Sequence, residues 1–391
     1  MVIEVKDRIY LDNSATTALS AGVKEAMVAA MEIYGNPSSL HTAGDEAHRL
    51  LNTAREQIYS AVGVRQADGW RAVFTASGSE ANNLAILGAA RAKKHFSSKR
   101  ILLTDSEHPS VARAVEALTR EGFEAVYIST RGGALDMVQL RNEAMKGVFL
   151  ASFMLVNNET GALYDIDAAA RAIRAVSPDA LIHCDAVQGF LRQALPRVSC
   201  GIDMISVSAH KIHGPKGVGA LIISPTVIKG RALIPVIYGG GQEEGLRSGT
   251  ENLVGIAGFG KAVAEGRLAL APNADKLRGL YSYATERLSA LGVTLNVPER
   301  HVDHIISVTV PNIKSQTMLN FLSARGICVS SGSACSSHDK KLSPALRAFG
   351  LDDKAADSTI RVSLCPENTA EDIDALVSAL SDGMRSLVKI K

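Results

Sequence analysis

Short apolar runs alternate with stretches of helical spacing over the first 230 or so positions of the chain. Residues 72–75, 101–104 and 148–156 are apolar and rich in β-formers, which predicts buried strands. Residues 77–95 and 167–176 carry apolar side chains at helical intervals. Further strands are predicted at 125–128, 180–185, 203–209 and 217–224, with another helix near 110–121. Strands that are apolar throughout and separated by helices indicate a mostly parallel sheet covered on both faces.

The pattern changes after about residue 260. A long helical stretch covers roughly 261–291, and strands are predicted at 304–311, 326–330 and 358–364 before a final helix. A chain of 391 residues is too long for one simple core. We therefore expect a large α/β domain followed by a smaller α+β domain.

Charge and cysteine content narrow the class of protein. The net charge is +2, so neither nucleic acid nor an anionic membrane is expected as a partner. The start of the chain lacks an apolar signal region, and no run of about 18 apolar residues occurs. Five cysteines without a CxxC pair fit neither a disulfide framework nor a metal cluster. These features predict a soluble protein of the reducing cytoplasm.

Polar residues follow several strands at the edge where α/β proteins bind ligands. Asp185 ends a buried strand and therefore needs a partner, either a helix start or a cationic ring nitrogen. Lys211 follows another buried strand, with Ser208 and His210 beside it. A lysine desolvated there could act as a nucleophile, although an ordinary surface lysine is the alternative.

Other polar positions allow two interpretations each. Residues 77–80, Ser-Gly-Ser-Glu, open a helix and suit either a phosphate site or a capping box. His108 could begin a helix or serve chemistry, and Asn158 lies in an Asn-Asn-Glu-Thr-Gly segment that could be a plain turn. Residues 239–252 form a glycine-rich loop that could bind closely or merely connect.

The segment SSGSACSSH at 330–338 places Cys335 among small residues. Such a composition is typical of an accessible loop, and an exposed thiol without a role is prone to oxidation. A linker that happens to contain a cysteine is the alternative. A phosphate turn, a strand-end aspartate and a strand-end lysine together are the requirements of pyridoxal phosphate.

The chain resembles a cysteine desulfurase of the class V aminotransferase superfamily. The resemblance rests on YLDNSATT, GNPSSLH, SGSEANN, NNETG, DAVQ, SAHKIHGPKGVGAL, GGGQEEGLRSGTEN and SSGSACSS, in the family's order. It implies the fold type I of pyridoxal-phosphate-dependent transferases, a large domain over 19–260, and a small domain over 1–18 and 261–391 that carries the cysteine loop at about 330–342. It also implies a homodimer that converts L-cysteine to L-alanine and leaves a persulfide on its own cysteine.

The resemblance implies a role for each matching residue. Lys211 holds the cofactor's aldehyde, Asp185 pairs with its ring nitrogen, Gln188 with its hydroxyl, and His108 stacks on the ring and moves protons. The remaining implied cofactor contacts are Gly78, Ser79, Asn158, Ser208, His210 and, from the other subunit, Thr250. Arg361 and Asn13 bind the substrate carboxylate, and Cys335 accepts the sulfur. Ser79 replaces the family's usual threonine, and Cys365 replaces a usual glycine.

Two other classes of function remain open at this stage. A selenocysteine lyase or a class V transaminase would use the same cofactor site, and a transaminase would not need Cys335. A non-catalytic binding or scaffold protein with this fold is disfavoured because all the expected residues are present: Lys211, Asp185, His108, Arg361 and Cys335. A sulfur acceptor or iron–sulfur scaffold protein is the expected partner, but the sequence does not identify it or its pathway.

Overall fold

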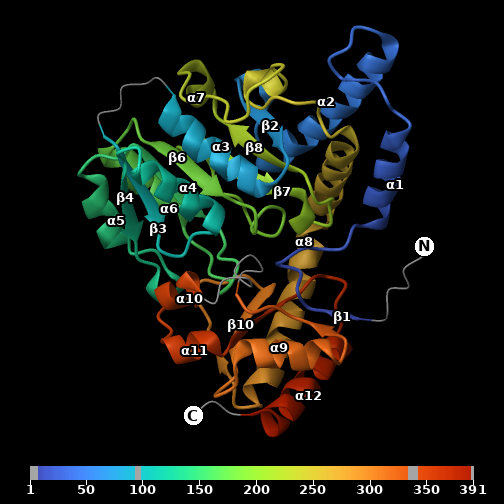
Figure 1. Ribbon diagram of the computed structural model, residues 1–391, viewed down its shortest axis with the longest axis vertical. Coiled ribbons are helices and arrows are strands. Elements are labelled where there is room, and N and C mark those ends of the chain that lie inside the picture. The colour runs from blue at the N-terminus through green and yellow to red at the C-terminus, as the bar shows by residue number, and fades with distance from the viewer. Residues whose placement is uncertain (1–7, 93–97, 333–341, 389–391) are drawn as a thin grey trace.

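The computed structural model describes residues 8–92, 98–332 and 342–388. Its largest feature is a seven-stranded sheet with the strand order β2-β8-β7-β6-β5-β3-β4, in the upper part of Figure 1. The strands are β2 (Arg71–Thr75), β3 (Arg100–Thr104), β4 (Glu124–Ile128), β5 (Leu150–Met154), β6 (Leu181–Asp185), β7 (Met204–Ser208) and β8 (Gly219–Ile223). Each strand begins no more than one residue outside the apolar run that predicted it.

The sheet is mostly parallel, as the pattern predicted. The pairs β3–β4, β3–β5, β5–β6 and β6–β7 are parallel, whereas β8 is antiparallel to both β7 and β2. Only residues 209–218 connect β7 to β8, which is too short for a crossover helix. The chain therefore returns in the opposite direction at β8.

Helices cover both faces of this sheet. On one face lie α3 (Gly78–Arg91), α4 (Pro109–Thr119) and α7 (Pro225–Lys229); on the other lie α2 (Thr42–Val62), α5 (Met137–Ala144), α6 (Ile166–Val176) and the first part of α8 (Leu253–Ser289). Neighbouring strand residues point to opposite faces, so Val73 packs on the face covered by α3 and Phe74 on the face covered by α2. This two-sided burial explains why the strands are apolar throughout.

Helices α1 (Ala21–Met31) and α2 were not predicted from the sequence. Only Val23 and Ala30 of α1 are buried, so its pattern is weak. The buried residues of α2 include Ala47, Leu51 and Ile58, which do recur at helical spacing. The signal in α2 was therefore present but was diluted by the polar residues around it.

The lower part of the molecule holds two small sheets around a core of its own (Figure 1). One sheet has the order β12-β10-β9 and the other pairs β1 with β11 in parallel. The strands are β1 (Ile9–Tyr10), β9 (Thr294–Leu295), β10 (Ile305–Thr309), β11 (Ile327–Cys328) and β12 (Thr359–Ser363). The helices are α9 (Ser315–Ser323), α10 (Pro344–Phe349), α11 (Asp353–Asp357) and α12 (Ala370–Ser386).

Helix α8 runs from beside the large sheet into this lower part (Figure 1). Asn252 caps its start by accepting a hydrogen bond from the Gly255 main-chain nitrogen at 3.1 Å. The boundary predicted at 260–261 falls inside this continuous helix, so the exact division into domains stays a prediction. In the described ranges, no helix is long and apolar enough to cross a membrane.

Five short 3₁₀ helices complete the described structure. They are η1 (Gln66–Asp68), η2 (Arg131–Gly133), η3 (Val198–Cys200), η4 (Ala209–Lys211) and η5 (Glu243–Gly245). Of these, η4 matters most for function because it carries Lys211 directly after β7.

Candidate active site

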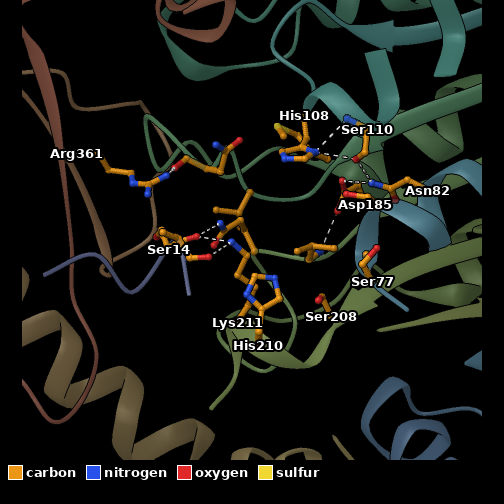
Figure 2. A pocket seen from close by; sticks show the side chains of 18 residues that line it. Ser14, Ser77, Asn82, His108, Ser110, Asp185, Ser208, His210, Lys211 and Arg361 are labelled. Atoms are coloured by element: carbon orange, nitrogen blue, oxygen red, sulfur yellow. Dashed lines mark hydrogen bonds between the residues drawn. The ribbon is translucent and has the colours of Figure 1, made fainter. Parts of the chain in front are cut away.

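The carboxyl ends of β5, β6 and β7 border a cavity of about 180 Å³. Its lining residues are Ser14, Ala15, Ser77, Gly78, Ser79, Asn82, His108, Ser110, Met154, Val156, Asn158, Asp185, Val187, Gln188, Ser208, His210, Lys211 and Arg361. Figure 2 shows Arg361 at one end of the group, Asp185 towards the other, and Lys211 between them. The cavity thus brings together most of the residues that the sequence predicted.

Asp185 stands at the end of β6 with its carboxylate fixed in place. One oxygen accepts a hydrogen bond from Asn82 Nδ2 at 2.7 Å, and the other accepts from the Val187 main-chain nitrogen at 3.0 Å. The side chain is nearly inaccessible to solvent. Because a carboxylate has further lone pairs, it can still receive a hydrogen bond from a ring nitrogen in the cavity.

Lys211 reaches back from η4 towards the N-terminal segment. Its Nζ donates to the main-chain oxygen of Ala15 at 2.9 Å and also to that of Ser14. Gln188 Nε2 donates to the same Ser14 oxygen at 2.8 Å. The segment at 14–15 therefore orients the lysine amine within the cavity.

The start of α3 forms a cradle at the end of the cavity away from Arg361 (Figure 2). Ser77 is the N-cap and accepts a hydrogen bond from the Glu80 main-chain nitrogen at 3.1 Å. The Glu80 carboxylate accepts from the Ala76 nitrogen at 2.9 Å, one residue before the N-cap. The capping arrangement leaves room for the predicted phosphate site, because Ser77, Gly78 and Ser79 at this helix start also line the cavity.

His108 is both the N-cap of a helix and a lining residue of the cavity. As the N-cap of α4 it accepts from the Ser110 nitrogen, and its Nδ1 lies 2.7 Å from the Ser110 hydroxyl. Burial lowers the pKa of His108, with Lys211 acting in the same direction and Asp185 against it. A neutral ring with Nδ1 engaged leaves Nε2 for a proton.

His210 and Glu107 are buried titratable groups beside the same cavity. Burial and the neighbouring Lys211 lower the pKa of His210 to about 4, so its ring is neutral at pH 7. Glu107 accepts hydrogen bonds from the Thr104 hydroxyl and the Met154 nitrogen, yet burial raises its pKa to about 8. Asp185 and Arg361 supply a carboxyl group and a guanidinium to the cavity lining.

Arg361 enters the cavity from β12 of the lower part of the molecule. Its Nη1 donates to the Asn158 main-chain oxygen at 2.7 Å, and its Nη2 donates to Asp12 Oδ1 at 2.8 Å. The side chain is 2% exposed. Within the described residues its Nε has no hydrogen-bond partner, so this nitrogen is open to a ligand.

Two predicted residues, Asn13 and Thr250, do not line the cavity. The Asn13 amide donates to the main-chain oxygen of Ser363 and to the Asn368 side chain, outside the cavity lining. Thr250 lines a separate cavity near Glu243 and Arg247 in the same chain. Cys335 lies outside the described residues. Their roles stay predictions.

Several further residues, which belong to none of the predicted roles, fix the site. Asn82 orients Asp185, Ser110 contacts both His108 and Asn82, and Asp12 pairs with Arg361. Asn82 sits one turn past the phosphate turn on the same helix, a position that could have identified it. Nothing local marks the pairing of Asp12 with Arg361.

The residues present fit pyridoxal phosphate. The Ser208 hydroxyl and Gln188 Oε1 are buried without a hydrogen-bond partner among the described residues, so both are open to a ligand. A Cβ added at Gly78 would lie 2.6 Å from Val187 Cγ2, so only glycine leaves the cradle clear. The lysine amine, the aspartate and the helix-end amides are the three groups this cofactor requires.

Fold and site together define a fold type I enzyme for pyridoxal phosphate, and comparison with known proteins specifies the family. The family described as Aminotransferase class-V matches residues 9–376, and the chain belongs to it. A cysteine desulfurase of Trichormus azollae is 35% identical over 384 residues, 96% of this chain and 92% of the relative. The resemblance read from the sequence motifs is therefore confirmed.

Solved structures agree with this assignment. A NifS-like protein superposes with a TM-score of 0.89 at 33% identity, covering 97% of this chain and all of that one. SspA, solved in complex with cysteine, gives a TM-score of 0.78 at 28% identity, covering 93% of this chain and 100% of its own. The predicted fold class is confirmed as well, and the protein is a pyridoxal-phosphate-dependent enzyme of the cysteine desulfurase kind.

Proposed function

We propose that the protein takes the sulfur of L-cysteine onto Cys335, releases L-alanine, and passes the resulting persulfide to an acceptor protein. The observation that carries this proposal is that Lys211, Asp185 and Arg361 line one cavity. Lys211 and Asp185 supply the amine and the acid that the cofactor needs. Arg361 supplies a guanidinium that can bind the carboxylate of an amino acid. The cysteine bound in the SspA structure supports the choice of substrate.

The residues divide the work along the cavity. Arg361 binds the substrate carboxylate, which directs the amino group towards Lys211. Bound pyridoxal phosphate withdraws electrons from the substrate so that its Cβ–S bond can break. Lys211 Nζ is the amine that moves the proton at Cα, while neutral His108 is placed to exchange a proton at Nε2.

The sulfur step balances without an external oxidant. The Cys335 thiolate attacks the substrate sulfur, an S–S bond forms, and the Cβ–S bond breaks with its electron pair going to Cβ. Cβ then takes a proton, and L-alanine leaves. The segment that carries Cys335 begins beside Arg361, because Ser330 and Arg361 exchange main-chain hydrogen bonds of 3.1 and 2.6 Å. This proximity supports Cys335 as the acceptor.

We further propose that the protein works as a homodimer in the cytoplasm. Thr250 lies outside the cavity of its own chain, which suits a contact made to the cofactor of the other copy. Exposed apolar side chains, including Tyr34, Leu40 and Tyr238, support self-association. The described cysteines are all free thiols, as a reducing compartment favours. An iron–sulfur scaffold or another sulfur carrier would receive the persulfide.

The test uses purified protein loaded with pyridoxal phosphate and given L-cysteine and a thiol reductant. L-Alanine and sulfide should form in equal amounts, without any keto acid. Amino transfer that depends on a keto acid, with no alanine from cysteine alone, would replace the proposal with a transaminase. The same assay with selenocysteine in place of cysteine tests the second alternative. Turnover of selenocysteine without turnover of cysteine would indicate a selenocysteine lyase.

A further inference from the structure

Arg361 lines the cavity, and its ion pair with Asp12 lies directly behind it. The two side chains are 2% and 16% exposed. Asp12 Oδ1 accepts from Arg361 Nη2, while Asp12 Oδ2 accepts from the Ser330 hydroxyl at 2.9 Å. Nη1 of the arginine is occupied by the Asn158 oxygen. Both partners are therefore held by further contacts and not only by each other.

The backbone fixes the same arrangement. Asp12 forms a parallel bridge to Ser363 at the end of β12, and Ser330 forms an antiparallel bridge to Arg361 on that strand. Tyr10, two residues before Asp12, has its pKa raised to about 12 by burial and by Asp12, so it adds no charge at neutral pH. The guanidinium thus has one carboxylate as its ion-pair partner within the described residues.

A substrate carboxylate would approach this same guanidinium. Its Nε lacks a partner in the described part of the chain, and Nη1 and Nη2 each carry a second N–H. Two carboxylates would then share one positive charge, and like charges at short range oppose each other. We infer that Asp12 sets the affinity of the site for the amino acid carboxylate: it orients Arg361 and offsets part of its charge, so that substrate and product exchange readily.

This inference rests on the proposed function, because it takes Arg361 as the group that binds the substrate carboxylate. The test measures binding and not turnover. Enzyme loaded with pyridoxal phosphate is titrated with L-alanine and with L-alaninamide, which lacks the carboxylate, and the absorbance of the bound cofactor is followed. The ratio of the two dissociation constants, amide over acid, reports how strongly the site recognises the carboxylate.

Asp12→Asn keeps the shape and the acceptor for Arg361 but removes the charge. We expect the ratio to rise about tenfold, because L-alanine should bind more tightly once the competing charge is gone. A factor of this size is usual for the coupling between two interacting groups. A residue that only held the fold together would weaken both ligands equally. Ser330→Ala is the matched control: it removes the hydrogen bond to Asp12 but leaves both charges, so its ratio should stay near that of the native enzyme.

Arg361→Ala separates this inference from the proposed function. Its ratio should fall towards one; a ratio that stays high would remove Arg361 from the substrate site. If Arg361→Ala behaves as expected and Asp12→Asn leaves the ratio unchanged or lowers it, Asp12 has no such role. Asp12→Ser, neutral but smaller, is titrated in parallel, so the question is still decided if Asp12→Asn fails to hold the cofactor.

Discussion

Asn82 Nδ2 lies 2.7 Å from Asp185 Oδ2, although 103 positions separate the two residues in the chain. Asn82 belongs to α3, whose first turn also forms the cradle of the cavity. One helix therefore fixes both the proposed phosphate site and the acid proposed to pair with the ring nitrogen. The distance between these two groups is set by the rigid helix and does not depend on a loop.

Replacing Asn82 by alanine should weaken cofactor binding. The change leaves one oxygen of a buried carboxylate without its donor, a loss of about 1–3 kcal/mol. The measurement is the dissociation constant of pyridoxal phosphate, followed by absorbance. Asn83→Ala is the control, since Asn83 donates to the Ser79 main-chain oxygen on the same helix and does not contact Asp185. Equal losses in the two variants would mean that only the helix was disturbed.

Replacing Lys211 by alanine should abolish turnover and the covalent attachment of the cofactor. Lys211 is the lysine that lines the described cavity, so no neighbouring amine takes its place. Mass spectrometry after borohydride reduction should find the cofactor on a peptide containing residue 211 in the native enzyme and on none in the variant. Lys216→Ala, an exposed lysine nearby, should behave as native. Full alanine production by Lys211→Ala would contradict the assignment.

The stability of the protein should fall as the pH drops from about 6.5 to about 4. His183 is fully buried between the hydroxyls of Ser152 and Ser206, both at 2.8 Å, and burial lowers its pKa to about 4. The unfolded chain binds a proton at this residue near pH 6.5. The contribution of neutral His183 to the free energy of unfolding is complete above pH 6.5. It is lost on acidification and amounts to about 3 kcal/mol between pH 6.5 and 4.

Thermal melting at several pH values tests this expectation. The melting temperature should decline between pH 6.5 and 4.5, and His183→Gln should decline less steeply from a lower starting value. His48→Gln, at an exposed position, should keep the native slope. An unchanged slope in His183→Gln would mean that other groups carry the acid sensitivity.

The local sequence pattern predicted much of the site because the reactive side chains lie at the ends of strands. Asp185 and Lys211 each follow a buried apolar run, and the carboxyl ends of parallel strands meet at one edge. The pairings of Asn82 with Asp185 and of Asp12 with Arg361 join distant segments, so no local pattern encodes them. The reversal of β8 follows from its short connection, residues 209–218, which leaves no room for a crossover helix.

The thiol assignment allows the sharpest test of the mechanism. Cys335→Ser should keep the yellow colour and still bind L-cysteine, because the cavity residues that hold cofactor and substrate are unchanged. It should form no persulfide and almost no alanine, since a serine hydroxyl is a poor nucleophile towards sulfur at neutral pH. Thiol labelling with alanine and sulfide assays measures each of these.

Cys328→Ser is the matched control for that experiment. Cys328 lies on β11, where it pairs with Tyr10 of β1, and it is half-buried, less than the fully packed core position that its apolar run suggested. Its loss should lower stability modestly and leave persulfide formation intact, because Cys328 is not among the residues that line the cavity. Persulfide formation that disappears with Cys328 and survives without Cys335 would assign the sulfur to the other thiol. Formation that survives both changes would show that the acceptor lies elsewhere in the chain.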